Sequence, residues 1–287
     1  MTAPMGAWRL RAALGPLLML ASPAVHAQSA ASDYRTDRPH GLPQQAEGAA
    51  AYDAAKPWTF GLLLPFLWQT NPASAPSNPR SGTDLAPEAA LGWAGQAGAL
   101  ELTVEGGAFL SDMAPVRGND SSGWFGSAQL TLGDAGERFA PYARYDVVAV
   151  YLDRFGTHDL TRHGLTLGVA RNFGDTALDL FATRSPTSGG VADRNVIGLS
   201  LGQELAAGPV GILLAADVEQ RFYDFDPDFG RHRSVNRIGL GAMAALPLSR
   251  AAKLAFSAEA QRYRSNDPDW CFTNFLIGPR LLLQFGF

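Results

Sequence analysis

The chain has 287 residues, of which 46% are hydrophobic and only 17% charged, and its formal net charge is −4. Because phosphate binding needs a positively charged face, this acidic balance without a basic cluster makes nucleic acid an unexpected partner. The lone cysteine, Cys271, excludes an internal disulfide bond.

Residues 1–27 have the pattern of a cleaved export signal. Arg9 and Arg11 precede an apolar run at residues 12–21, and small or modest side chains follow it. The run is too short to span a bilayer as a stable helix. We therefore expect cleavage before Gln28 and export of the remainder.

Residues 28–57 are rich in Ala, Gln, Asp and Pro and show neither helical nor strand periodicity. This composition is typical of a disordered segment, here a periplasmic leader. An alternative is that residues 34–40 fold back and plug the interior of the domain that follows.

The first strand is predicted at residues 58–70. Its even positions are all large and apolar, with aromatic residues at both ends, whereas its odd positions are mixed. Aromatic girdles of this kind mark the two interfaces of a membrane-spanning strand. Because Pro65 has no N–H to donate, we expect a bulge or imperfect pairing there.

Eleven further segments have the length and alternation of tilted barrel strands. They are residues 86–94, 99–111, 123–132, 140–154, 161–173, 177–184, 195–205, 210–225, 235–246, 253–264 and 273–287. The total of about twelve is even, and short and long connections alternate along the chain with one five-residue exception. This alternation favours an antiparallel meander with short turns at one end and longer loops at the other.

The last segment, residues 273–287, is apolar at every second position and carries Phe285 and Phe287 at its end. Position 283, on the same face, is Leu283 and not a phenylalanine, so the aromatic signal is limited to the last two of these positions. A final amphipathic strand of this kind resembles the assembly signal of Gram-negative outer-membrane β-barrel proteins.

The resemblance implies an all-β transmembrane barrel over residues 58–287, inserted by the barrel-assembly machinery. It also implies a location in the cell outer membrane and contact with its lipid and lipopolysaccharide. No narrower family is indicated.

The face opposite to the apolar one carries charged residues of both signs, with carboxylates in excess. The predicted lumen-lining residues are Glu101, Glu105, Arg144, Asp146, Arg162, Asp179, Glu204, Asp217, Glu219, Arg221, Arg237, Glu259 and Arg280. In one interpretation these charges pair across strands and fill a narrow interior. In the other, glycines on the same face, such as Gly168 and Gly198, leave a path for a small polar or ionic solute. We favour a narrow channel with a slight cation preference.

Three alternative functions remain open. One is a closed structural or surface-interaction barrel. Another is a polymer export barrel for exopolysaccharide, for which inward aromatic residues would be needed. The third is a lipid- or lipopolysaccharide-modifying enzyme, but His163 is followed by Gly164 and Leu165 and not by a serine two positions later. We therefore predict no catalytic residue and expect no enzymatic activity.

A metal site is considered at Asp224, Asp226 and Asp228, because alternate carboxylates resemble the start of a calcium loop. The glycine comes one position late, at Gly230, and Val235 stands where the last ligand belongs. The sequence therefore predicts no metal and no cofactor.

Overall fold

The computed structural model describes residues 56–71, 81–114, 120–152, 154–188, 192–226 and 231–287. The predicted export signal and all of the leader except Lys56 and Pro57 lie outside the described residues, as do Asp228 and Gly230.

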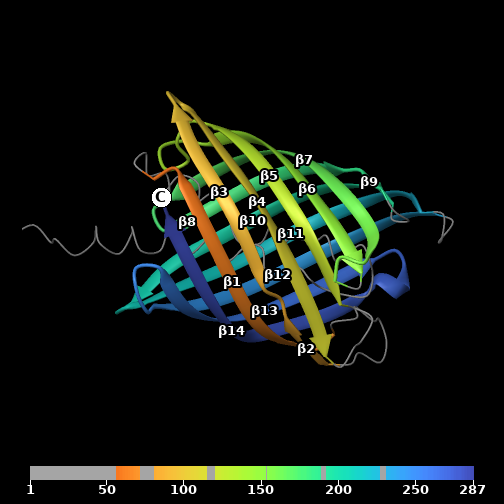
Figure 1. The fold of residues 1–287 in the computed structure, drawn as a ribbon. Helices are drawn as coiled ribbons and strands as arrows, with labels where there is room; N and C mark the ends of the chain where they lie inside the picture. The colour runs from red at the N-terminus through yellow and green to blue at the C-terminus, as the bar shows by residue number, and fades with distance from the viewer. Residues whose placement is uncertain (1–55, 72–80, 115–119, 153, 189–191, 227–230) are drawn as a thin grey trace, which may run out of the picture.

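Fourteen strands form one antiparallel sheet, and this sheet closes into a barrel because the last strand pairs with the first (Figure 1). The strands are β1 (Trp58–Gln69), β2 (Gly82–Leu85), β3 (Glu88–Ala97), β4 (Leu100–Ala114), β5 (Ser121–Leu132), β6 (Ala140–Leu152), β7 (Thr157–Phe173), β8 (Thr176–Ser185), β9 (Thr187–Ser188), β10 (Arg194–Ala207), β11 (Val210–Asp226), β12 (Arg231–Pro247), β13 (Ala252–Ser265) and β14 (Phe272–Gly286).

Two of the barrel's twelve positions are each occupied by two strands, one of which is short. The strands β2 and β3 both pair with β1 and β4 and are separated by Ala86 and Pro87, while β8 and β9 both pair with β7 and are separated by Pro186. A proline cannot donate to the ladder, so pairing stops there and restarts beyond it. The twelve-stranded, up-and-down prediction is confirmed. The loops predicted at residues 71–85 and 185–194 are too long, because each contains one of these short strands.

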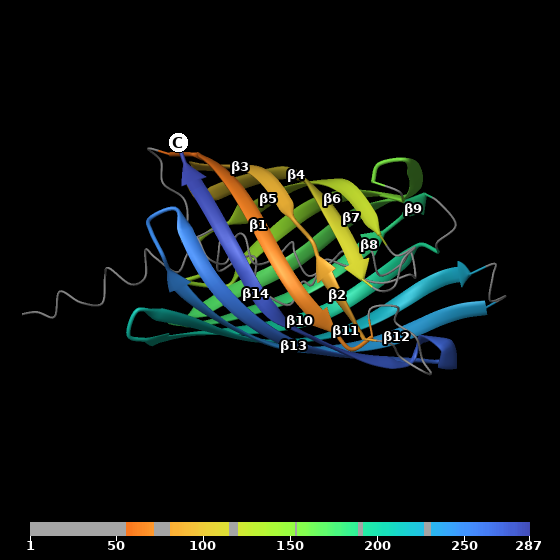
Figure 2. The same ribbon diagram turned by 60° about the horizontal axis from the view of Figure 1, so that its bottom comes forward.

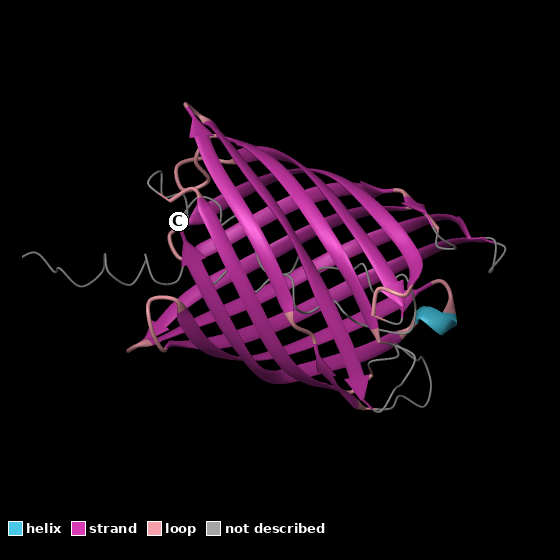
Figure 3. Ribbon diagram, viewed as in Figure 1, coloured by secondary structure: helices cyan, strands magenta, loops and turns pink. Residues whose placement is uncertain are grey.

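The short turns of the barrel share one end with the C-terminus, which lies beside the start of β1 (Figure 2). Gly98, Gly174 and Gly208 open three of these turns with positive φ angles. Two-residue hairpins of type II′ require this conformation at their first central position. The connections at the opposite end are longer than these three turns and include the one helical turn of the described residues, η1 (Pro268–Trp270; Figure 3), while residues 133–139 between β5 and β6 form a long connection at the C-terminal end. Since barrels of this kind have short periplasmic turns, the end with the C-terminus is the periplasmic one.

Side chains alternate between the two faces of the barrel wall, apart from the register shifts between Val150 and Tyr151 and between Phe222 and Phe225. On β4, for example, Leu102 and Val104 are exposed on the outside, whereas Glu101 and Glu105 are half-buried on the inside. The outer face is therefore apolar, and closure leaves no strand edge that lipid would have to solvate. No helix in the described part of the chain is long and apolar enough to cross a bilayer.

The end of β14 shows how far the aromatic part of the last strand extends. Phe285 is exposed on the outer wall, and its ring stacks on that of Phe60 of β1 with the ring centroids 6.5 Å apart. Position 283 lies on the same face, opposite Leu62 of β1, but it is Leu283 and supplies no ring. The aromatic residues of the terminal signal are therefore Phe285 and Phe287 alone, because position 283 is a leucine.

The seam between β1 and β14 keeps one register from Thr59 opposite Gly286 to Gln69 opposite Leu276. Pro65 interrupts the regular pairing without shifting that register, so the expected imperfection is present but no bulge forms. At Gly278 the two backbones approach so closely that an added Cβ would overlap the carbonyl oxygen of Phe66. Glycine is therefore required here by the packing of backbone on backbone.

We expect Gly278→Ala to weaken this seam. The methyl group would force β1 and β14 apart, with a loss of about 1–3 kcal/mol in the free energy of unfolding. The midpoint of urea unfolding in detergent, followed by the gel mobility shift between folded and unfolded barrel, measures the loss. Gly286→Ala is the matched control, because the nearest heavy atom to its added Cβ is 3.7 Å away. Equal midpoints for the two variants would contradict the packing argument.

Candidate functional site in the barrel interior

All the predicted lumen-lining side chains are buried or half-buried on the inward face of the wall. Further charged residues are buried toward the outer mouth and were missing from the predicted lining, among them Asp84, Arg194 and Arg233. Asp84 and Arg233 lie in strand extensions where the sequence predicts loops. Arg233 continues the inward row of Arg237 at strand period two, and this spacing is the signal that could have revealed it.

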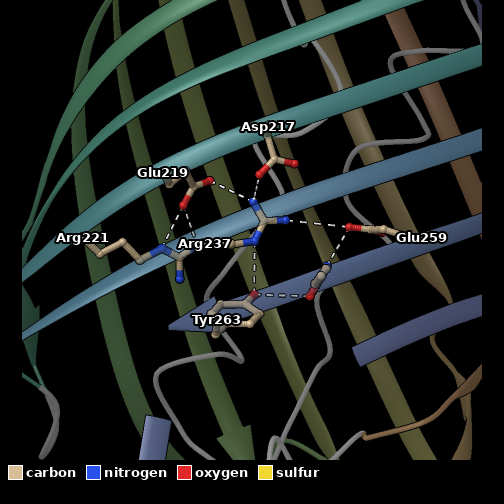
Figure 4. A network of polar contacts seen from close by, with 7 residues as sticks. Asp217, Glu219, Arg221, Arg237, Glu259 and Tyr263 are labelled. Atoms are coloured by element: carbon tan, nitrogen blue, oxygen red, sulfur yellow. Dashed lines mark hydrogen bonds and ion pairs between the residues drawn. The ribbon is translucent and has the colours of Figure 1, made fainter. Parts of the chain in front are cut away.

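The densest group of charges lies on three adjacent strands, β11, β12 and β13 (Figure 4). At its centre is Arg237, which is 1% exposed. Its Nη1 contacts a carboxylate oxygen of Asp217 and lies 3.1 Å from Oε1 of Glu219. Its Nη2 lies 3.7 Å from Glu259, so a single guanidinium is surrounded by three carboxylates.

Neighbouring side chains hold these carboxylates in place. Arg221 donates to Oε2 of Glu219 from both Nε, at 2.8 Å, and Nη2, at 2.6 Å. Gln261 donates to Glu259 at 2.7 Å, while the hydroxyl of Tyr263 accepts a hydrogen bond from Arg237 Nε at 3.2 Å. The group is thus a connected network, which we call the Arg237 cluster, and each of its guanidinium groups is paired with carboxylates within the wall.

Other predicted residues form smaller groups outside the Arg237 cluster. Arg144 contacts Asp146 at 2.7 Å, and the hydroxyl of Tyr142 donates to Asp179 at 3.2 Å. Arg280 donates to Ser257 at 2.8 Å. These three groups come respectively from β6, from β6 with β8, and from β13 with β14. The polar lining of the wall therefore extends well beyond the Arg237 cluster.

Two further predicted charges lie toward the periplasmic end. Glu101 is opposite Thr131 of β5, close to the start of β4. Glu204 is opposite Leu213 of β11, close to the end of β10. Neither residue is brought to the Arg237 cluster, so the structure does not assemble the predicted charges into a single site.

Inward aromatic rings lie flat over glycines of the neighbouring strand. An added Cβ at Gly168 would meet the ring of Tyr142, and one at Gly198 would meet the ring of Phe181. The side chain of Asp217 occupies the space above Gly239 in the same manner. The space above these glycines, expected to widen the path, is therefore occupied by side chains that lie against the wall.

The inner wall also has an apolar region on β3 to β7. Phe125, Val148, Val150 and Leu160 pack together there, with Phe109 against them. This region lies on other strands than the Arg237 cluster of β11 to β13. The strands of this apolar region also carry inward charges, such as Glu105 and Arg144, so apolar and charged side chains alternate along this part of the inner wall.

At the outer mouth, an arginine is held between two aromatic rings. The guanidinium carbon of Arg233 lies 4.0 Å from the ring centroid of Tyr223 and 3.4 Å from that of Trp270. Trp270 belongs to the helical turn η1 between β13 and β14, and Cys271 follows it. These cation–π contacts hold the connection at residues 266–271 against the inner wall.

The histidines of the outer wall have other partners than a serine. Nδ1 of His163 lies 2.7 Å from the hydroxyl of Tyr145, and Nε2 of His158 lies 2.9 Å from that of Thr161. Asp224, the first residue of the considered calcium loop, forms an ion pair with Arg184 at 2.8 Å. Within the described ranges, no three His, Cys, Asp or Glu residues are grouped so that they could hold a metal ion.

No protein-family model matches the chain, and no curated protein is significantly similar to it. Among solved structures, the chain is similar to an outer membrane channel from Pseudomonas putida F1. The TM-score is 0.56 at 12% identity, over 80% of this chain and 96% of that one. The chain has the fold of an outer-membrane β-barrel. Together with the exposed apolar outer face, this fold locates it in the cell outer membrane.

Two further similarities have TM-scores below 0.5 and support no argument about function. The translocator domain of the autotransporter NalP from Neisseria meningitidis has a TM-score of 0.46 and 13% identity, over 86% of this chain and 93% of that one. Outer membrane phospholipase A from Escherichia coli has a TM-score of 0.43 and 10% identity, over 78% and 92%. An enzyme is thus among the similar structures, and the absence of catalysis stays a prediction.

Replacing the central cation of the Arg237 cluster should destabilise the barrel strongly. Arg237→Met leaves Asp217 and Glu219 buried without their shared counter-charge, and such a loss costs about 3–5 kcal/mol. Urea unfolding in detergent gives the change in free energy.

Two variants sharpen this test. Arg237→Met combined with Asp217→Asn should recover part of the loss, because one of the uncompensated charges is removed. Arg250→Met, at an exposed periplasmic turn, should change stability by less than about 0.5 kcal/mol. A single Arg237 variant as stable as wild type would refute a structural role for the cluster.

Removing the ring of Trp270 should release the connection at residues 266–271. A buried cation–π contact is worth about 1–2 kcal/mol, so Trp270→Ala should raise the rate of Cys271 labelling by a maleimide roughly 5- to 30-fold. Cys271 is the only cysteine of the chain, so no other thiol contributes to the signal. Trp124→Ala, which removes an exposed ring of the outer wall, should leave the rate unchanged. Equal rates for both variants would show that the ring does not hold the connection.

Proposed function

We propose that the barrel is a narrow channel for small polar or ionic solutes, with a slight preference for cations. The observation that carries this proposal is the inner wall, where charged and polar side chains of many strands face inward and carboxylates outnumber arginines. The outer surface of the barrel is apolar, and its stability in lipid does not require a charged lining on the inside. Charges on the inside are most useful where water and solutes pass.

The size of the barrel agrees with this proposal. Eight-stranded barrels are filled by their own side chains, whereas barrels of sixteen or more strands hold wide aqueous channels. Twelve strands lie between these cases. The similar Pseudomonas putida protein is described as an outer membrane channel, and at 12% identity this similarity supports only a shared fold.

The cation preference is argued from the carboxylates that stand outside the Arg237 cluster. Glu101 and Glu105 lie on the same inward row of β4, four residues apart. Glu101 is opposite Gln96 of β3 and Thr131 of β5, so its cross-strand neighbours are uncharged. Glu105 interacts with Arg144, which is itself paired with Asp146. Carboxylates therefore still outnumber guanidinium groups on this part of the wall, and a passing cation would meet a negative potential there.

A second candidate function is supported by the Arg237 cluster itself. Two guanidinium groups, of Arg221 and Arg237, and two carboxylates, of Asp217 and Glu219, are almost fully buried and compensate one another. Such a network also suits a closed barrel that acts through its outer loops, in which the inner charges serve packing alone. Conductance separates the two candidates.

Single-channel conductance of the refolded barrel in a planar bilayer tests the proposal. We expect stable conductance steps and a reversal potential that indicates cation selectivity. In Glu101→Gln/Glu105→Gln the cation-to-anion permeability ratio should fall about two- to fivefold. The reason is that removing one unit charge at about 4–8 Å changes an ion's energy by about 0.5–1 kcal/mol in water.

The control is Glu137→Gln, which removes an exposed carboxylate from the periplasmic turn after β5 and should change selectivity less. A folded barrel without conductance would refute the channel and favour the closed barrel. Conductance with unchanged selectivity in the double variant would refute the role of these two carboxylates.

A further inference from the structure

The outer wall of β12, β13 and β14 changes character along its height. From the periplasmic end upward it is apolar, with Leu246, Leu254 and Phe256 exposed, and it stays so as far as Ile238 and Phe275. Above these residues the exposed outward positions of β13 are Arg262 and Arg264. They point away from the interior, since their neighbour Tyr263 is buried inside.

The surrounding wall offers these arginines no counter-charge. No Asp or Glu stands at an outward position of these three strands. The outward positions are the even ones at 232–246 and 252–264 and the odd ones at 273–285. Elsewhere at this end of the barrel, exposed arginines are paired within the protein: Arg154 with Asp112, and Arg184 with Asp193 and Asp224. In the part of the chain that the structure describes, no ion pair of Arg262 or Arg264 is found.

The height of the two arginines can be estimated from the strand geometry. Eight residues separate Leu254 from Arg262, which is about 26 Å along a strand and about 20 Å along the membrane normal at a tilt of about 40°. An apolar band is about 25 Å tall, so Arg262 lies near its outer boundary and Arg264 about 5 Å farther out. Both guanidinium groups therefore reach the headgroup layer of the outer leaflet.

Polar neighbours complete the surface. Thr273 of β14 is opposite Arg262, and Asn236 of β12 is opposite Arg264. Both are exposed on the outer wall and can donate or accept hydrogen bonds. The exposed side chains of Ile238 and Phe275 lie just below, where acyl chains begin.

We propose that Arg262 and Arg264 form a binding site for the phosphate groups of lipopolysaccharide on the outer wall of β13. The guanidinium fork matches phosphate geometry and can bind it through two parallel hydrogen bonds. The occupant must be anionic at the headgroup and apolar below it, and the phosphorylated lipid of this leaflet has both properties. The site is on the outside of the wall, so it does not depend on whether the barrel conducts.

The test uses the whole barrel refolded in a zwitterionic detergent and titrated with purified lipopolysaccharide, with bound lipid counted by native mass spectrometry. We expect wild type to bind lipopolysaccharide and Arg262→Gln/Arg264→Gln to bind it roughly 30-fold more weakly. Each basic residue near a charged lipid surface contributes a factor of about five. Lipid A without phosphate should bind wild type as weakly as lipopolysaccharide binds the double variant.

The matched control is Arg138→Gln/Arg250→Gln, which removes two exposed arginines at the periplasmic turns and should bind as wild type does. The gel mobility shift verifies that each variant is folded. Equal affinity in wild type and the Arg262/Arg264 variant would overturn the proposal, as would an equal loss in the control, which would indicate attraction by overall charge. We expect that inorganic phosphate in moderate excess leaves lipopolysaccharide binding unchanged, because the acyl chains contribute to affinity. Full displacement of the lipopolysaccharide by phosphate would overturn the assignment to a lipid.

Discussion

The structure depends on one constraint: inside a membrane, every backbone N–H and C=O must find its partner within the protein. The pairing of β1 with β14 satisfies the last open edge. The same requirement explains the alternation of side chains, because a paired strand directs every second residue to lipid and the others inward. Where a proline breaks a strand, as at Pro87 and Pro186, the ladder resumes at once in the strand that follows. These proline interruptions are thus only one or two residues long.

Inside the barrel, a second constraint acts on charge. Arg237 is almost completely buried, and burial of an isolated guanidinium would be far too costly without carboxylates around it. Its partners come from both neighbouring strands, so the cluster connects three strands in addition to lining the interior. The rings over Gly168 and Gly198 act in a comparable way, since each fills the gap that a glycine leaves on the adjacent strand. The inner wall is therefore organised by contacts between neighbours and not by one central site.

The fold could be predicted from the sequence to a large extent, because a strand with one face in lipid has a strong period-two signal. Leu102 and Glu101 differ so clearly in polarity that their faces are unambiguous. The bounds of β2 and β9 could not be predicted, since prolines hide the continuity of a strand that crosses them. Which charged side chains contact each other could also not be predicted from the sequence. That Arg237 contacts Asp217 depends on the register of β11 against β12, and nothing in either segment alone fixes this register. The position of Trp270 over Arg233 depends on the path of a connection, for which periodicity gives no information.

The closing seam has a consequence for how the chain folds. A hydrogen bond joins the backbone of Phe275 to the side chain of Thr70 across 205 positions of sequence, whereas most other pairings join consecutive strands. The meander can thus form locally and early, hairpin by hairpin, but its two edges can meet only after the last strand has been made. Until then each edge offers unpaired N–H and C=O groups to any other strand. We therefore expect the slow step of folding to be this one long-range encounter, and the risk of aggregation to be greatest while the sheet is open.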